Sequence, residues 1–187
     1  MCIVSSFCVI LLICGLTPNL NVMNDIIIRF VSQPDVTKLA KLRFALRSRD
    51  SSNVETEAAF LKRCESWMAE VLNRTTWRCW VAEQEGDLLG ALWLQLIEKI
   101  PNPTAESECF GYITNFFVAE SARGKGLGSR ILDEALAWCR EQNVHAVILW
   151  PTEKSRSLYQ RHGFTLPDDL LELELSDSDG ITGSVPR

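Results

Sequence analysis

The sequence predicts a mixed α/β fold in a single domain. The chain has 187 residues, an ordinary size for one domain with a sizeable core. Of these residues 47% are hydrophobic and 23% are charged, as is usual for soluble proteins. From Ile26 onward, short apolar segments alternate with longer segments of helical periodicity, and no internal repeat or linker divides them. This alternation indicates a sheet flanked by helices.

The first elements are one strand and two helices. Ile26 to Val31 forms a short apolar segment that predicts a strand. Residues 33–48 begin with Pro34 and Asp35 and then carry apolar residues at helical spacing, so they predict a helix. Residues 53–72 predict a second helix, in which Asn53 is the N-cap and acidic residues occupy the first turn.

Strands dominate the middle of the chain. Residues 77–84 and 88–100 are apolar and flank the turn sequence EGD, which predicts a β-hairpin. After a loop over 101–107, residues 109–119 predict another strand. The remaining elements follow in order: a helix over 126–142, a buried strand over 145–150, a helix over 152–163 closed by Gly163, and one or two strands over 164–175.

The two ends of the chain differ from this pattern. The apolar run from Cys2 to Leu16 is shorter than the roughly 20 residues of a membrane helix, and no Lys or Arg precedes Arg29 to form the start of a signal peptide. We expect residues 1–22 to be a start-site artefact or an ill-ordered extension, with a lipoprotein-like or uncleaved anchor as the alternative. The predicted domain spans 23–175, followed by a loose tail over 176–187.

Charge and cysteine content bound the function. The formal net charge of −5 argues against a nucleic-acid partner, which usually requires a basic face. The seven cysteines are scattered and form no C-x-x-C pair, so we expect reduced thiols without a metal site or disulfide framework. These observations predict a cytoplasmic protein without a membrane association, and a homodimer stays open.

A glycine-rich junction is the most informative motif. In VAESARGKGLGSRIL, residues 118–132, a strand gives way to a helix through a turn with three glycines. Unpaired N–H groups at the positive end of a helix dipole bind anions, phosphate above all. The order of residues does not fit a Walker loop, and a dinucleotide fingerprint would place its third glycine at Ser129. Arg123, Gly126 and Gly128 instead fill the pattern [Arg/Gln]-x-x-Gly-x-[Gly/Ala], although glycines can also simply end a strand.

A second motif, SRSLYQRHGF at 155–164, ends the next strand–helix unit. Together, NFFVAESARGKGLGSRIL at 115–132 and WPTEKSRSLYQRHGF at 150–164 make the chain resemble the GNAT superfamily of acyl-CoA-dependent N-acetyltransferases, from Met23 to about Leu175. The resemblance implies a mixed, mostly antiparallel sheet of six to seven strands with about four helices. It also implies that two central parallel strands, Tyr112–Val118 and His145–Trp150, splay apart.

The resemblance also assigns a cofactor site. Acetyl-CoA would lie in the opening as co-substrate, with its pantetheine arm against the backbone of Phe116, Phe117 and Val118. Thr152 stands where many relatives carry an asparagine that touches the pantetheine. The pyrophosphate would bind the turn, which comprises Arg123, Gly124, Lys125, Gly126, Leu127, Gly128 and Ser129.

The implied reaction is direct attack of a primary amine, small or peptidic, on the thioester. Tyr159 would protonate the leaving sulfur, although a tyrosine beside Leu158 and Phe164 is also an ordinary core residue. Asn115 is expected to be a satisfied buried amide. A non-catalytic acyl-CoA sensor is the main alternative, and a nucleotide-binding oxidoreductase is a distant third.

The general base is not assigned by the resemblance. Glu98, Glu106 and Glu108 are the candidates, and a route through water is the alternative. Acceptor identity is expected to depend on residues 48–57 and on the loop 100–108. The acidic residues there, Asp50, Glu55, Glu57, Glu106 and Glu108, hint weakly at a cationic acceptor.

Overall fold

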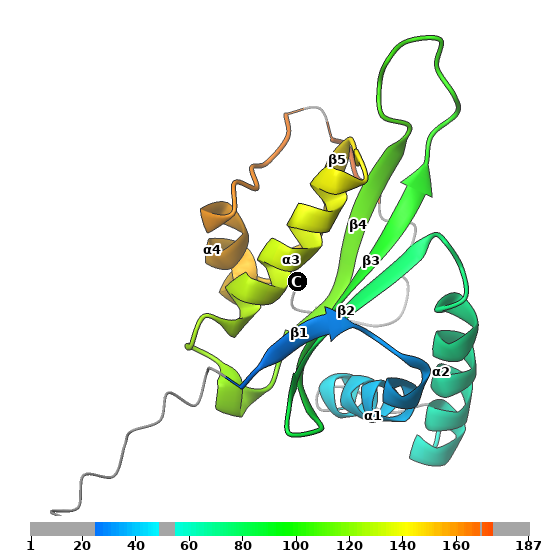
Figure 1. Ribbon diagram of the computed structural model, residues 1–187, viewed down its shortest axis with the longest axis vertical. Coiled ribbons are helices and arrows are strands. Elements are labelled where there is room, and N and C mark those ends of the chain that lie inside the picture. The colour runs from blue at the N-terminus through cyan, green and yellow to red at the C-terminus, as the bar shows by residue number, and fades with distance from the viewer. Residues whose placement is uncertain (1–24, 49–54, 169, 174–187) are drawn as a thin grey trace, which may run out of the picture.

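The sheet at the centre of the molecule has helices on both faces (Figure 1). The structure is a computed structural model that describes residues 25–48, 55–168 and 170–173. Its elements are β1 (Ile27–Phe30), η1 (Gln33–Asp35), α1 (Val36–Arg47), α2 (Glu57–Val71), β2 (Trp77–Gln84), β3 (Asp87–Glu98), β4 (Cys109–Val118), η2 (Glu120–Ala122), α3 (Leu127–Glu141), β5 (Ala146–Ile148) and α4 (Glu153–Arg161). The predicted mixed α/β fold is confirmed.

The five strands lie in their sequence order, β1-β2-β3-β4-β5. The first three pairings are antiparallel, and only β4 and β5 run parallel. The predicted β2–β3 hairpin turns at Glu85 and Gly86, which both have positive φ values of 52° and 87°. Two consecutive positive φ values match the right-handed twist of the flanking strands, which explains the EG sequence at this position.

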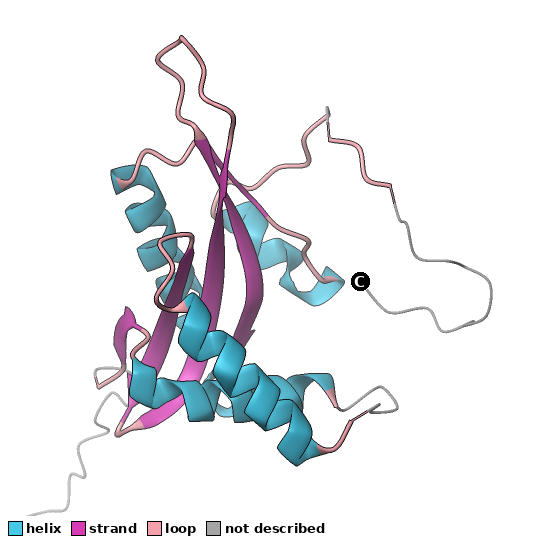
Figure 2. Ribbon diagram, turned by 90° about the vertical axis from the view of Figure 1, so that its right-hand side faces the viewer, coloured by secondary structure: helices cyan, strands magenta, loops and turns pink. Residues whose placement is uncertain are grey.

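Each face of the sheet has its own apolar core. On one face α3 packs through Leu127, Ile131, Leu132 and Ala135, and Tyr159 of α4 joins the same cluster. On the other face α1 and α2 pack through Leu39, Ala40, Met68 and Val71 against Trp93 and its neighbours. Figures 1 and 2 show these two helix pairs on opposite sides of the strands. The sheet is therefore buried on both faces in its central part.

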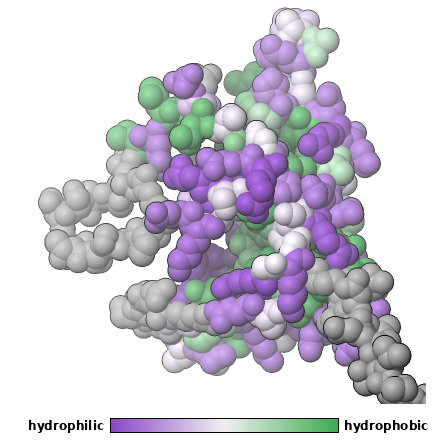
Figure 3. Space-filling model, turned by 90° about the vertical axis from the view of Figure 1, so that its left-hand side faces the viewer, coloured by the Kyte–Doolittle hydropathy of each residue, from purple (hydrophilic) through white to green (hydrophobic). Residues whose placement is uncertain are grey.

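The C-terminal segment differs from the prediction. Residues 164–168 and 170–173 form no strand, so the described sheet has five strands and β5 lies at its edge. Pro167 has no backbone N–H to donate, and β5 offers a pairing edge only three residues long. Leu166, Leu170, Leu171 and Leu173 are exposed. Hydrophobic side chains of this segment gather at the upper left of Figure 3, beside the grey atoms.

Other predictions fall partly outside the described residues. Residues 1–22, Met23 and the tail 176–187 lie there, as does Asn53. The N-cap of α2 is instead Thr56, whose side chain accepts a hydrogen bond from the Ala59 amide. Among the described residues, no helix combines the length and the apolar character needed to cross a membrane.

Candidate functional site

The opening between β4 and β5 is the first feature of the site. The two strands pair only from Phe110 to Tyr112 on β4, although β4 continues to Val118. The segment Ile113–Val118 therefore has β3 on one side and, among the described strands, no partner on the other. An unpaired strand edge presents N–H and C=O groups that an extended ligand can bind. The predicted splay of the two parallel strands is confirmed.

A β-bulge interrupts β4 inside this opening. Ala91 pairs with Phe117 and Trp93 pairs with Thr114, so Asn115 and Phe116 both lie opposite Leu92. Asn115 adopts a positive φ of 48°, which asparagine tolerates better than other side chains. Its side-chain oxygen accepts a hydrogen bond of 2.7 Å from Nη1 of Arg43 on α1. The side-chain oxygen is satisfied by an arginine that the sequence did not single out, and Asn115 is half-buried rather than buried as predicted.

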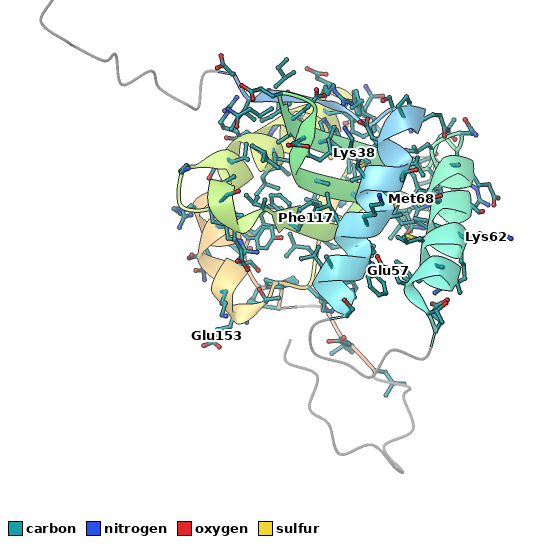
Figure 4. All side chains as sticks on the ribbon, turned by 90° about the horizontal axis from the view of Figure 1, so that it is seen from below. Lys38, Glu57, Lys62, Met68, Phe117 and Glu153 are labelled. Carbon is teal, nitrogen blue, oxygen red and sulfur yellow. The ribbon has the colours of Figure 1, made fainter. Side chains whose placement is uncertain are left out.

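The two residues of the bulge face opposite sides of the sheet. Phe116 packs with the α3 cluster, and its ring lies 6.4 Å from that of Tyr159. Asn115 points to α1. Phe117, the next residue, packs on the α1–α2 side, and Figure 4 shows it beside α1. The free edge of β4 is thus flanked by Tyr159 on one face of the sheet and by Arg43 on the other.

The glycine-rich turn joins the end of β4 to α3. Gly124 and Gly126 have φ values of 73° and 79°, and a Cβ at either position would meet nothing within 4 Å. Gly126 is the N-cap of α3. The amides of residues 124–129 donate no hydrogen bond to any other described residue. Six amides without a partner among the described residues, at the positive end of a 15-residue helix, are an arrangement that typically binds anions, and the space over Gly124 and Gly126 is open.

The side chains of the turn play different parts. Arg123 Nε donates to the Val118 carbonyl at 2.9 Å, and Lys125 Nζ donates to the Ser121 carbonyl at 3.0 Å. Both cations are exposed at the rim of the turn. Gly128 faces inward, because a Cβ there would lie 3.6 Å from Leu158 and 3.7 Å from Val118. Leu127 is buried and Ser129 is half-buried at the start of α3.

Tyr159 is held by the local structure of α4. Tyr159 is 8% exposed, and the centroid of its ring lies 5.6 Å from that of Phe164. Gly163, with a φ of 86°, ends the helix and lets the Phe164 amide donate to the Tyr159 carbonyl. Burial raises the pKa of Tyr159 to about 12. The hydroxyl is therefore protonated at neutral pH, and it forms no hydrogen bond with another described residue.

Not all the predicted residues lie at the opening. Thr152 is the exposed N-cap residue of α4, and its hydroxyl hydrogen-bonds Ser155. Glu98 pairs with Cys109, six positions before Asn115, or about 20 Å along the strand. Glu106 and Glu108 lie in the adjoining loop, where they contact Asn102. The three proposed bases therefore lie at the far end of β4.

Comparison with known proteins identifies the family. The model of the acetyltransferase (GNAT) family matches residues 44–164, and the chain belongs to this family. The chain is also similar to a 5-NmdU N-acetyltransferase of Pseudomonas phage PaMx11, with 30% identity over 91 residues. That match covers 49% of this chain and spans 59% of the phage protein.

Solved structures share the fold. A predicted acetyltransferase from Clostridium acetobutylicum, solved with acetyl-CoA, has a TM-score of 0.66 and 24% identity, over 80% of this chain and 96% of that one. A GCN5-related N-acetyltransferase from Ralstonia eutropha JMP134 has a TM-score of 0.64 and 25% identity, over 80% and 98% of the two chains. The resemblance inferred from the two sequence motifs is confirmed.

Proposed function

We propose that this protein is an N-acetyltransferase that transfers the acetyl group of acetyl-CoA to a primary amine. The six unpaired amides of residues 124–129, at the end of the free edge of β4, are the observation that carries the proposal. A diphosphate suits backbone amides and a helix dipole, and an extended pantetheine arm suits an unpaired strand edge. The Clostridium structure, which contains acetyl-CoA, supports this ligand.

The chemistry follows from the groups on either side of β4. A neutral amine attacks the thioester carbonyl, negative charge develops on the carbonyl oxygen, and backbone N–H groups at the free edge of β4 stabilise that charge. The carbon–sulfur bond then breaks, and the Tyr159 hydroxyl donates its proton to the leaving sulfur. The elevated pKa of Tyr159, about 12, keeps that proton available throughout the neutral range.

A carboxylate base has no support at the bulge, because Glu98, Glu106 and Glu108 lie at the far end of β4. We therefore propose that the amine loses its proton to water. The lack of a carboxylate near the bulge also favours a second candidate function, that of a non-catalytic acyl-CoA sensor. It favours this function over that of an enzyme with a carboxylate base. Release of free thiol in the presence of amines separates the two candidates.

A matched pair of glycine variants tests the binding site. Gly126→Ala and Gly86→Ala each place a side chain at a positive φ with open space around it, so each should cost about 1 kcal/mol of stability. Only Gly126 lies at the proposed phosphate site. Calorimetry should show acetyl-CoA affinity at least about 10-fold weaker in Gly126→Ala and unchanged in Gly86→Ala. Equal affinities in both variants would make the turn purely structural.

The acceptor panel should include amines attached to larger molecules. The name of the phage relative implies an acceptor amine on a modified nucleobase, and the chain spans only 59% of that protein. Small amines, amino acids, peptides and aminomethylated nucleosides therefore belong in one thiol-release panel. Turnover of any of them with acetyl-CoA would establish the proposed reaction.

A further inference from the structure

Arg43 is a half-buried cation at the opening, and no carboxylate among the described residues pairs with it. Its Nη1 donates to Asn115 Oδ1, a neutral acceptor. Four other arginines form salt bridges with carboxylates of described residues, namely Arg29, Arg63, Arg74 and Arg123. Burial lowers the pKa of the Arg43 guanidinium, and the neighbouring charge of Arg47 lowers it further. The described residues thus place a positive charge at this point without a carboxylate beside it.

Arg29 shows what a compensated arginine looks like in the same protein. Its guanidinium binds Asp35 at 2.7 Å and 2.9 Å and Glu83 at 2.5 Å, and these partners raise its pKa. A guanidinium carries five donor hydrogens in a planar fork that matches a carboxylate or a phosphate. The contact with Asn115 engages one nitrogen of Arg43, and the other donors of this fork have no partner among the described residues.

In the proposed complex, Arg43 lies close to the reacting acetyl group, on the face of the sheet opposite Tyr159. If the pantetheine arm pairs with Val118, Phe117 and Phe116 from the turn inward, the acetyl end comes to lie next to Asn115. Tyr159 is on the α3–α4 face of the sheet at this level, through its contact with Phe116. Arg43 is on the α1–α2 face, through its contact with Asn115. An amine that attacks from the side opposite Tyr159 therefore arrives beside Arg43.

We propose that Arg43 binds an anionic group of the acceptor, so that the substrate is an amine carrying a carboxylate or a phosphate close to its amino group. The inference rests on the proposed acetyl transfer and names its substrate class. A cation at this position also disfavours the protonated form of a nearby amine, which favours nucleophilic attack. Three of the five acidic residues that hinted at a cationic acceptor do not oppose this, because Glu55 pairs with Arg63, and Glu106 and Glu108 lie at the far end of β4. Asp50 lies outside the described residues.

The test compares matched amines in matched variants. Glycine against glycinamide, and 2-aminoethyl phosphate against ethanolamine, differ in the anionic group. Comparing the kcat/KM ratio within each pair across variants cancels the different basicities of the two amines. Arg43→Gln removes the charge but keeps an amide donor for Asn115, whereas Lys41→Gln removes an exposed charge from the same helix.

We expect wild type and Lys41→Gln to prefer the anionic member of at least one pair by about 10-fold or more, the scale of one charge-assisted contact. In Arg43→Gln this preference should fall to near unity. The pair that shows the effect distinguishes a carboxylate from a phosphate. A wild-type preference for neutral or cationic amines, or a preference that survives in Arg43→Gln, would refute the assignment.

A second measurement does not depend on turnover. With CoA present, N-acetylglycine or N-acetyl-2-aminoethyl phosphate should raise the Tm of wild type and of Lys41→Gln, but not that of Arg43→Gln. The corresponding N-acetylglycinamide should leave all three unchanged. If thiol release fails while this anion-dependent shift is found, the proposed catalysis is wrong and the Arg43 assignment stands. Absence of the shift in wild type overturns the assignment whatever the activity.

Discussion

The Tyr159→Phe variant removes a single oxygen atom and tests whether the tyrosine hydroxyl protonates the leaving sulfur. The substitution keeps the ring that packs against Phe116 and Phe164 and removes only the hydroxyl. If that hydroxyl protonates the leaving sulfur, kcat should fall by about 10- to 1,000-fold, the scale of general acid catalysis. Acetyl-CoA affinity should change little, because the proposed proton transfer assists a step after binding.

The structure predicts how this variant responds to pH. The hydroxyl forms no hydrogen bond within the described part of the chain, so at pH 7 the free energy of unfolding should change by about 0.5 kcal/mol or less. Tyrosine in an unfolded chain has a pKa near 10, whereas that of Tyr159 is raised to about 12 by burial. The unfolded state therefore loses this proton first, and wild type is destabilised as pH rises from about 10 to 12. The two-unit difference in pKa corresponds to roughly 3 kcal/mol of stability, and Tyr159→Phe, which has no titrating hydroxyl at this position, does not lose it.

The assay measures kcat at saturating acetyl-CoA with the best amine of the panel, under conditions in which chemistry limits turnover. Tyr112→Phe removes the other tyrosine hydroxyl of the chain and serves as the control, with kcat expected within about twofold of wild type. Urea unfolding at pH 7 and pH 11.5 supplies the stability comparison. Equal kcat values for wild type and Tyr159→Phe would return Tyr159 to the role of a core aromatic residue.

Two further predictions concern the turn and the fold. Arg123→Ala should weaken acetyl-CoA binding by about 1 kcal/mol or less, because this exposed side chain already contacts the Val118 carbonyl; a calorimetric loss of 3 kcal/mol would contradict this. Asp35→Asn should cost about 3 kcal/mol at pH 7, because Asp35 is buried and accepts two hydrogen bonds from Arg29. Arg29 holds the pKa of Asp35 well below its usual range, so this stabilisation is present above about pH 4 and lost as pH falls further. Urea unfolding should show the gap between wild type and Asp35→Asn closing below pH 4, and a gap independent of pH would refute the linkage.

The sequence alone determined the features that depend on neighbouring residues. The EG turn, the glycines at 124 and 126, and Gly163 at the end of α4 are visible because positive φ values select glycine locally. The periodicity of each segment predicted the helices and strands, apart from the segment 164–175. The two motifs were sufficient to indicate the family, and they placed Tyr159 because α4 and its C-cap are continuous in sequence.

Only the tertiary structure decided which residues from distant parts of the sequence lie next to these motifs. The contact between Arg43 and Asn115 joins residues 72 positions apart, and an arginine on an amphipathic helix gives no local signal of its partner. The same holds for the acidic residues near the β3–β4 loop, which sequence could propose as bases but which the antiparallel register carries to the far end of β4. The described residues of 164–175 read as strand, yet strand formation needs a partner edge, and β5 supplies only three residues. Backbone conformation is encoded locally, whereas the pairing of side chains depends on how the whole sheet packs.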